Sequence, residues 1–282
     1  MIALARPLAA LSLLLPVSAV GAQTGRDVIL ATTTSTQDTG LLDSLVPRFE
    51  RTCRCRVKTI AVGTGRALAL AGRGEADVAL VHAPTLEERY VAEGKFVERR
   101  LVMTNDFVLL GPPADPAGLR RRREVDEVFR TLAAGTAPFA SRADSSGTHL
   151  LELSLWRRVG AEPKGPWYLE VGQGMGATLR VASQKQAYTL SDRGTFLAQR
   201  ATLDLDVVFD GAPELLNVYH VMVPNPDSFP RANLAGGRAF AEFLVAPETQ
   251  AFIARFGTER FGQPLFKPAA KRREEDLRRG AA

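Results

Sequence analysis

The sequence predicts an α/β protein built from two lobes, with two crossovers between the lobes and a cleft where they meet. Three observations support this prediction. β-branched segments alternate with amphipathic helical segments, which is the pattern of α/β lobes. About 260 residues follow the N-terminal region, more than one hydrophobic core usually supports. Two strand-like segments end in Gly-Pro-Pro and Pro-Asn-Pro, where the chain can leave one lobe for the other.

Residues 1–22 predict a secretory signal peptide. Arg6 precedes an apolar run, and small residues end at Ala22, where a signal peptidase would cut. The apolar run is shorter than the roughly 20 residues that a membrane-spanning helix needs, and no later stretch approaches that length. We therefore expect the mature chain to begin near Gln23 and to be periplasmic or secreted, without membrane insertion. An N-terminal core helix is the alternative.

Residues 23–109 and 219–282 form the predicted first lobe. Leu41, Leu45 and Phe49 share one face of its first long helix. The remaining apolar and amphipathic segments continue the alternation. The expected elements are strands at 27–34, 55–64 and 76–83 and helices at 39–52, 65–75 and 85–94.

Residues 110–218 form the predicted second lobe. A strand at 101–111 leaves the first lobe, and a strand at 215–226 returns to it. Within the second lobe we expect helices at 118–135, 148–160 and 175–186 and strands at 138–144 and 167–173. The C-terminal part should form two helices within 236–257, separated at Pro247, and then a charged tail in solvent at 271–282.

The charge balance excludes a nucleic-acid-binding function. The chain has 36 Lys and Arg and 31 Asp and Glu, so loss of Arg6 with the signal peptide leaves a net charge of +4. Such a small excess helps to steer a small anion but is too weak for a nucleic-acid surface. The run Arg120–Arg123 opens a predicted helix and is explained as its solvent face.

The two cysteines, Cys53 and Cys55, are separated by one residue. A disulfide between residues i and i+2 closes a strained ring, so we expect free thiols at the surface or on an edge strand. An intermolecular bridge in an oxidising compartment is the alternative. A structural metal site needs about four ligands, and the sequence offers two here.

Residues Thr32–Thr36, with the sequence TTTST, lie between a predicted buried strand and a helix. The first amide groups of a helix lack internal partners and the helix dipole is positive there, so an anion can bind. Thr34 and Ser35, with Thr33 beside them, would add hydroxyl donors without adding charge. A simple N-cap is the alternative, but it requires only one Ser or Thr.

A second turn of this kind contains Gly63, Thr64 and Gly65. Glycines let the backbone approach a ligand closely, and Thr64 supplies a hydroxyl group. The spacing is not that of a P-loop. A tight turn between a strand and a helix explains this motif equally well.

A third turn, SRADSSGTH, spans Ser141–His149. Arg142 has a fork of donors that suits an oxyanion. Further hydroxyl and amide groups come from Ser145, Ser146, Gly147 and Thr148. The alternative is an N-capped helix in which Arg142 pairs with Asp144. Three such turns in one chain favour a cage for an oxyanion in the cleft.

A fourth turn, Gly172–Gly176, should begin another helix that faces the cleft. Arg193 follows it and is a further candidate ligand. The adjacent Asp192 and Arg193 could instead form a structural ion pair.

Several segments, taken in order, resemble the periplasmic tungstate-binding proteins of tungstate ABC transporters. The resemblance implies the two-lobed type II periplasmic binding protein fold, which this family shares with its molybdate-binding relatives. It also implies a tetrahedral dianion held by hydroxyls, amides and an arginine. The matching segments lie between Thr32 and Pro226 and are TTTST, AVGTG, VMTNDFVLLGP, SRADSSGTH, LW, WYLEVGQGMG, AYTLSDRGT and LLNVYHVMVPNP.

The resemblance assigns ligand-binding roles residue by residue. The principal positions are Thr34, Ser35, Thr64, Arg142, Ser146 and Thr148, and the secondary positions are Thr33, Ser145, Gly147 and Arg193. Ala143 departs from the glycine usual in the family, Ser145 stands where charged residues are common, and the Cys-Arg-Cys segment is foreign to the pattern. These departures affect the local backbone shape and the selectivity of the site.

The expected ligand is tungstate or molybdate, delivered to the membrane subunits of an ABC importer by a monomer without cofactor or cation-binding site. Sulfate stays an alternative, and phosphate becomes one if Asp144 offers an acceptor in the cleft. A secreted serine hydrolase is the rival class, but His82, His149 and His220 lack an accompanying GxSxG motif. An extracytoplasmic sensor would share the ligand chemistry and differ in its partner.

Overall fold

The structure is a computed structural model that describes residues 26–135 and 137–279. The predicted signal peptide therefore lies outside the described residues. No helix within these ranges combines the length and the apolar character needed to cross a membrane.

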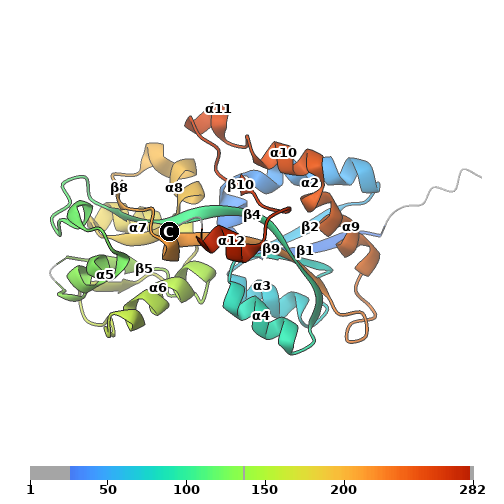
Figure 1. Cartoon of the computed structure of the whole chain (residues 1–282), viewed down its shortest axis with the longest axis horizontal. Helices are drawn as coiled ribbons and strands as arrows, with labels where there is room; N and C mark the ends of the chain where they lie inside the picture. Colours follow the sequence, from blue (N-terminus) through green and yellow to red (C-terminus); the bar gives the residue numbers. More distant parts are fainter. Residues whose placement is uncertain (1–25, 136, 280–282) are drawn as a thin grey trace, which may run out of the picture.

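Helices and strands alternate along the chain (Figure 1). The strands are β1 (Val28–Thr33), β2 (Val57–Val62), β3 (Val78–Val81), β4 (Phe96–Gly111), β5 (Phe139–Ser141), β6 (Tyr168–Glu170), β7 (Thr189–Asp192), β8 (Asp206–Phe209), β9 (Leu216–Pro224) and β10 (Lys267–Pro268). The α-helices are α1 (Thr34–Asp38), α2 (Leu41–Cys53), α3 (Thr64–Ala71), α4 (Pro84–Ala92), α5 (Val125–Ala133), α6 (Gly147–Arg158), α7 (Met175–Lys185), α8 (Arg193–Gln199), α9 (Leu234–Val245), α10 (Pro247–Ile253), α11 (Thr258–Phe261) and α12 (Glu274–Arg279). Short 3-10 helices are η1 (Leu119–Arg121), η2 (Arg200–Thr202) and η3 (Pro213–Leu215).

Strand β4 belongs to both halves of the molecule. Its first part pairs antiparallel with β9 and β10, in a sheet of order β10-β4-β9-β3-β1-β2. Its last part, from Phe107 to Gly111, pairs antiparallel with β7 and β8. Within the first sheet, β1 lies between the parallel strands β2 and β3. The long strand therefore joins the two lobes that lie side by side in Figure 1.

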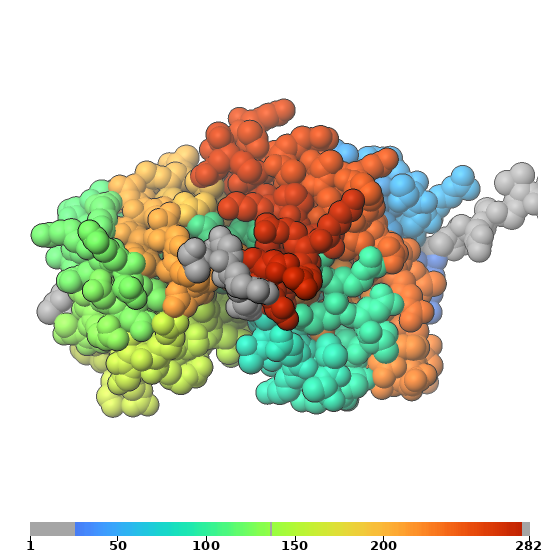
Figure 2. Space-filling model, in the orientation of Figure 1, coloured from blue at the N-terminus to red at the C-terminus, as the bar shows by residue number. Residues whose placement is uncertain are grey.

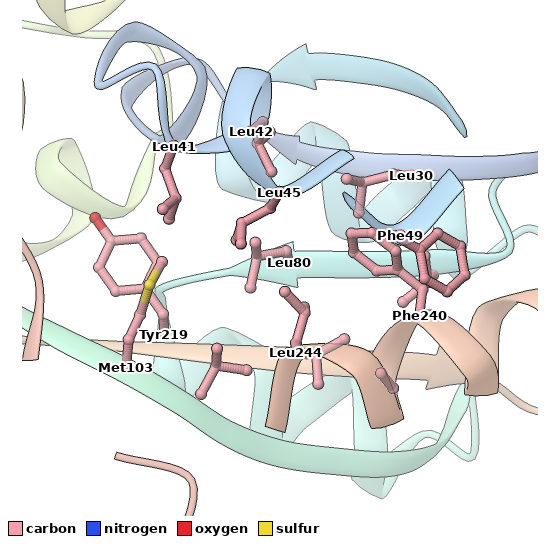
Figure 3. Packing of buried hydrophobic residues seen from close by; sticks show 14 of the residues in the cluster. Leu30, Leu41, Leu42, Leu45, Phe49, Leu80, Met103, Tyr219, Phe240 and Leu244 are labelled. Carbon is pink, nitrogen blue, oxygen red and sulfur yellow. The ribbon is translucent and has the colours of Figure 1, made fainter. Parts of the chain in front are cut away.

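The buried apolar residues also divide between two lobes. The clusters of the first lobe draw their buried members from 28–103 and 219–266, and those of the second lobe from 107–215. In the first lobe, Leu41, Leu45 and Phe49 of α2 point toward the sheet, and Phe49 lies against Phe240 of α9 (Figure 3). The Phe49 and Phe240 rings meet edge to face with centroids 5.0 Å apart. The boundaries expected at residues 109/110 and 218/219 stay predictions.

Two details differ from the sequence expectations. The helix expected at 118–135 is divided into η1 and α5, because Arg122 adopts an extended conformation between them. The chain from 189 to 209 forms β7, α8 and β8, which we did not assign from the sequence. The break at Pro247 is confirmed, since α9 ends at Val245 and α10 begins at Pro247.

We expected the charged C-terminal segment to lie in solvent, but part of it packs against the rest of the protein. It forms α12, in which Leu277 is buried and Glu274 Oε2 lies 3.2 Å from Arg99 Nη2. Figure 2 shows this segment, in dark red, lying in front of the junction between the lobes.

The expectation of free thiols is wrong, because Cys53 and Cys55 form a disulfide. Helix α2 ends at Cys53, and Arg54 adopts a left-handed conformation with φ of 52°. This turn brings the two Cα atoms to 5.2 Å, within the range that a disulfide spans. The turn at the helix end therefore removes the geometric obstacle that the spacing implied.

Candidate functional site

The first predicted turn lies where β1 runs into α1. Thr33 is the N-cap of α1, and its Oγ1 accepts a hydrogen bond of 3.3 Å from the Thr36 amide. The same Oγ1 lies 3.0 Å from Ser35 Oγ. The hydroxyl of Thr33 therefore serves the helix itself, whereas Thr34 and Ser35 occupy the first two helical positions, where amides have no partner within the helix.

The second turn joins β2 to α3 and places Thr64 at the first helical position. The N-cap is Gly63, which has no side chain to cap the helix. Thr64 is fully buried, and its Oγ1 has no hydrogen-bond partner in the described part of the chain. A hydroxyl group buried without a partner costs free energy, and a ligand oxygen would remove that cost.

The third turn joins β5 to α6 and contains Arg142, whose exposed fraction is only 2%. Its Nη2 lies 2.5 Å from Asp144 Oδ2 and 3.4 Å from Thr34 Oγ1. Its Nε is buried without a partner among the described residues. The Asp144 pairing considered for this turn is present, but it uses only part of the guanidinium fork, and one N–H stays available for an anion.

The same turn starts α6 with two further predicted ligands. Ser146 is the N-cap, and its Oγ accepts a hydrogen bond of 3.3 Å from the His149 amide. Thr148 is buried, and its Oγ1 has no partner among the described residues. Ser146 thus resembles Thr33 in serving its own helix, and Thr148 resembles Thr64.

Close backbone contacts bring these turns from the two lobes together. A Cβ atom added to Gly63 would lie 3.3 Å from the Asp144 carbonyl oxygen, and one on Gly147 only 2.8 Å from that of His82. The predicted fourth turn joins them, since a Cβ on Gly174, the N-cap of α7, would lie 3.3 Å from Thr34 Oγ1. The amino termini of α1, α3, α6 and α7 therefore converge.

Two secondary candidates stand apart from this arrangement. Ser145 is exposed, and its amide donates to His149 Nδ1 at 3.1 Å. Arg193 pairs with Asp106 at 2.6 Å and with Asp210 at 2.5 Å, so the ion pair considered for Arg193 exists with partners other than Asp192. The structure does not bring Arg193 to the unpartnered donors.

The departures from the family pattern fall at strained backbone positions. Ala143 and Ser145 have φ angles of 47° and 57°, in the left-handed region that favours glycine. The glycine usual at position 143 is thereby explained, and Ala143 adopts the same conformation at some cost in strain.

Two buried groups behind the turns were not among the predicted site residues. His82 follows β3, and its Nε2 lies 3.2 Å from Ser35 Oγ. Burial, assisted by the nearby Arg142, lowers the pKa of His82 to about 4, although the hydrogen bond with Asn217 opposes the shift. The sequence signal for His82 was its place at the carboxyl end of a buried strand, the edge from which the other turns start.

Glu152 lies behind the Arg142 turn. Its carboxyl group accepts hydrogen bonds from Ser141 Oγ at 2.9 Å, Trp156 Nε1 at 3.1 Å and Tyr168 Oη at 2.7 Å. Burial raises the pKa of Glu152 to about 7, although these hydrogen bonds oppose the shift. The sequence signal for Glu152 was that it is the one acidic residue in the largely apolar segment THLLELSLW of α6.

Comparison with known proteins first defines the class. Residues 18–248 match the family described as a PBP superfamily domain, so the chain belongs to this superfamily of binding proteins. The match confirms the two-lobed type II α/β fold that the sequence predicted.

Individual relatives then define the family. The tungstate-binding protein TupA of Peptoclostridium acidaminophilum is 45% identical over 245 residues, which are 86% of each chain. A solved structure of the tungstate ABC transporter from Geobacter sulfurreducens is 44% identical, with a TM-score of 0.74, and covers 82% of this chain and 98% of that one. The tungstate-binding protein TupA from Desulfovibrio alaskensis G20 is 38% identical with a TM-score of 0.73, over 88% and 100% of the two chains. The chain belongs to the family of tungstate-binding proteins of ABC transporters, which confirms a binding protein rather than an enzyme.

Proposed function

We propose that the chain captures tungstate in the cleft between its lobes and delivers it to the membrane subunits of an ABC importer. The observation that carries the proposal is the set of buried donors without partners. Thr64 Oγ1 lies in the β2–α3 turn, whereas Arg142 Nε and Thr148 Oγ1 lie in the β5–α6 turn, and these two turns converge at one place. Tetrahedral oxyanions present acceptors in several directions, and such a set of donors suits them.

The donors favour an anion that carries no proton. Asp144 is the carboxylate within the Arg142 turn, and its two oxygens face Arg142 Nη2 and the Ser146 amide, 3.1 Å away. It therefore caps the turn, and both of its oxygens are already engaged by donors of the protein. Tungstate, molybdate and sulfate are fully deprotonated at neutral pH and fit this arrangement better. The family relationship supports tungstate, with molybdate as the second ligand.

The proposed ligand set follows the sequence prediction with two changes. We place the oxyanion against Thr34, Ser35, Thr64, Arg142, Ser146 and Thr148, with the backbone of Thr33 and Gly147 in support. We leave out Arg193 and also Ser145, whose amide donates to His149 Nδ1. Closure of the lobes around the anion would bring the donors together and exclude water. No cofactor and no cation enter this scheme.

The working form of the protein is proposed to be a monomer outside the cytoplasmic membrane, after cleavage near Ala22. Among the described residues, the exposed large apolar side chains are those of Val91, Val97 and Leu150, a small number that favours a monomer. Light scattering and intact mass of the secreted protein test these two points.

Calorimetric titration of the mature protein with tungstate, molybdate, sulfate and phosphate tests the proposed ligand. We expect tungstate and molybdate to bind far more tightly than sulfate, and phosphate to bind least. Binding of phosphate alone would refute the ligand assignment and leave the fold unaffected. Co-purification with the importer membrane subunits, with and without tungstate, tests delivery.

A further inference from the structure

His82 lies between two helix amino termini of the proposed site. Its Nε2 faces Ser35 Oγ in α1, and its carbonyl oxygen and ring edge lie against Gly147 at the start of α6. The ring is 3% exposed and stacks on Tyr219, with centroids 4.7 Å apart and an interplanar angle of 24°. The side chain has no room to move away from Ser35.

The imidazole of His82 is neutral at physiological pH, because burial depresses its pKa to about 4. A neutral imidazole has one N–H donor and one acceptor nitrogen, and the partner of one nitrogen decides the role of the other. Asn217 is that partner, since its Oδ1 lies 2.9 Å from His82 Nδ1.

The contacts define a direction for the hydrogen bonds. Asn217 Oδ1 accepts from His82 Nδ1–H, so Nε2 must accept, and the Ser35 hydroxyl donates to it over 3.2 Å. The Ser35 proton then points away from the cleft. This direction leaves Asn105 Nδ2 buried without a partner, while Asn217 Nδ2 donates to Asn105 Oδ1 at 2.8 Å.

Rotation of both amides by 180° reverses the direction. Asn105 Nδ2 then donates to Asn217 Oδ1, and Asn217 Nδ2 donates to His82 Nδ1. Tyr219 Oη, which accepts from Asn217 Nδ2 at 3.1 Å in the forward direction, donates to Asn217 Oδ1 after the rotation. His82 Nε2–H donates to Ser35 Oγ, and the Ser35 proton is then shared between Thr33 Oγ1, 3.0 Å away, and an anion at the site. The rotation replaces a buried N–H without a partner by a buried carbonyl without one, and the latter is less rare in proteins.

We propose that His82, acting through Ser35, is a positioning residue that sets whether the site presents a donor or an acceptor at Ser35. The proposal rests on the proposed function, because a fully deprotonated oxyanion accepts hydrogen bonds and donates none. Such an anion is bound in the reversed direction, with the proton of His82 on Nε2. The forward direction suits an anion that carries a proton.

Nitrogen NMR of the mature protein tests the proposal directly, since protonated and unprotonated ring nitrogens have distinct ¹⁵N shifts. The variant His82→Gln identifies the His82 signals among those of the histidines. We expect saturating tungstate to give a protonated Nε2 and an unprotonated Nδ1. A tungstate complex that retains the proton on Nδ1 would overturn the proposal. Absence of tungstate binding in calorimetry would instead refute the proposed function.

A double-mutant cycle between Asn217→Asp and Ser35→Ala separates the relay from simple electrostatics. A carboxylate at 217 can only accept, so it holds the proton on Nδ1 and the Ser35 hydroxyl away from the cleft. We expect Asn217→Asp to weaken tungstate binding about tenfold in the native background and much less in the Ser35→Ala background. Equal losses in both backgrounds would show a charge effect and contradict the relay. If Asn217→Asp does not fold, the NMR measurement on the native chain still decides.

Discussion

The two lobes differ in the chemistry that they offer at the proposed site. The side from the first lobe contributes hydroxyls and helix amino termini at Thr34, Ser35 and Thr64, supported by the neutral ring of His82. The side from the second lobe contributes Arg142, held by Asp144 and supported by the acidic Glu152. Formal charge is concentrated on one side and neutral donors lie on both. Charge compensation and orientation of the anion are therefore separable, and substitutions in each lobe should affect one without the other.

Loss of the charge should have the largest effect. Arg142→Ala removes the cation of the cleft and leaves Asp144 without its partner, so the site becomes repulsive to a dianion. We expect tungstate binding to weaken about a hundredfold, measured by calorimetry. Arg158→Ala is the matched control, because Arg158 also lies in the second lobe and pairs with Asp126 and Glu214 at the surface. Equal effects of the two variants would contradict a special role for Arg142.

The supporting groups of the two sides should respond to pH in opposite directions. The folded pKa of Glu152, about 7, exceeds its ordinary value of 4.5, so its contribution to stability is full below 4.5 and is lost as pH rises to about 7. The folded pKa of His82, about 4, lies below 6.5, so its contribution is full above 6.5 and is lost as pH falls toward 4.

Glu152→Gln tests the acidic half of this contrast. Glutamine reproduces the protonated acid, with its amide facing Ser141 Oγ and its oxygen facing Trp156 and Tyr168. Through Glu152, the free energy of unfolding of the native protein should fall by about 2–3 kcal/mol between pH 4.5 and pH 8. The variant should not show this decrease. Urea unfolding at several pH values measures the difference. A constant difference between variant and native protein at all pH values would be inconsistent with a raised pKa at Glu152.

A smaller effect should follow from holding the two sides apart. A Cβ atom at Gly147 would lie 2.8 Å from the His82 carbonyl oxygen, closer than real Cβ atoms come to backbone. Gly147→Ala should therefore hinder closure and weaken tungstate binding about tenfold while the lobes stay folded. Gly65→Ala is the graded comparison, because its Cβ would lie 3.4 Å from the Ser145 carbonyl oxygen. Calorimetry and small-angle scattering should show the larger effect for Gly147→Ala, and the reverse order would contradict closure at this contact.

The sequence predicted much of the fold because its signals are local. Strands β1, β3 and β9 are buried apolar segments bounded by turn residues, and α2 has a clear apolar face. The short elements β7, α8 and β8 were missed because their residues pack through contacts with β4 rather than through a periodic pattern. The disulfide was missed because it depends on the left-handed turn at Arg54.

For the candidate site, the sequence indicated the positions of the turns but not the directions of their hydroxyl groups. Each turn could be found from its Ser, Thr and Gly residues at a strand-to-helix junction, and the structure brings these turns together. The direction of each hydroxyl could not be found, because it depends on partners distant in sequence. Asn217 lies 135 residues from His82, and Arg193 is occupied by Asp106, 87 residues away. Long-range partners therefore decide which predicted donors are available.

The smallest expected effects come from the paired neutral donors. Thr64 of the first lobe and Thr148 of the second have the same proposed chemical role. The Oγ1 atom of each is buried without a partner among the described residues. Replacing either with valine removes one donor to the anion but no internal hydrogen bond. We therefore expect tungstate binding to weaken about three- to tenfold in each variant, with unchanged or slightly raised stability.

Thr189→Val is the matched control for these two variants. Thr189 is also buried, but its Oγ1 donates to the Ala140 carbonyl oxygen at 2.8 Å. Its replacement should lower the free energy of unfolding by about 1 kcal/mol or more, because the carbonyl loses its partner. Urea unfolding and calorimetry of the three variants measure both quantities. If Thr64→Val and Thr148→Val lost stability as Thr189→Val does, their hydroxyls would have internal partners. These two neutral donors would then not be reserved for an anion.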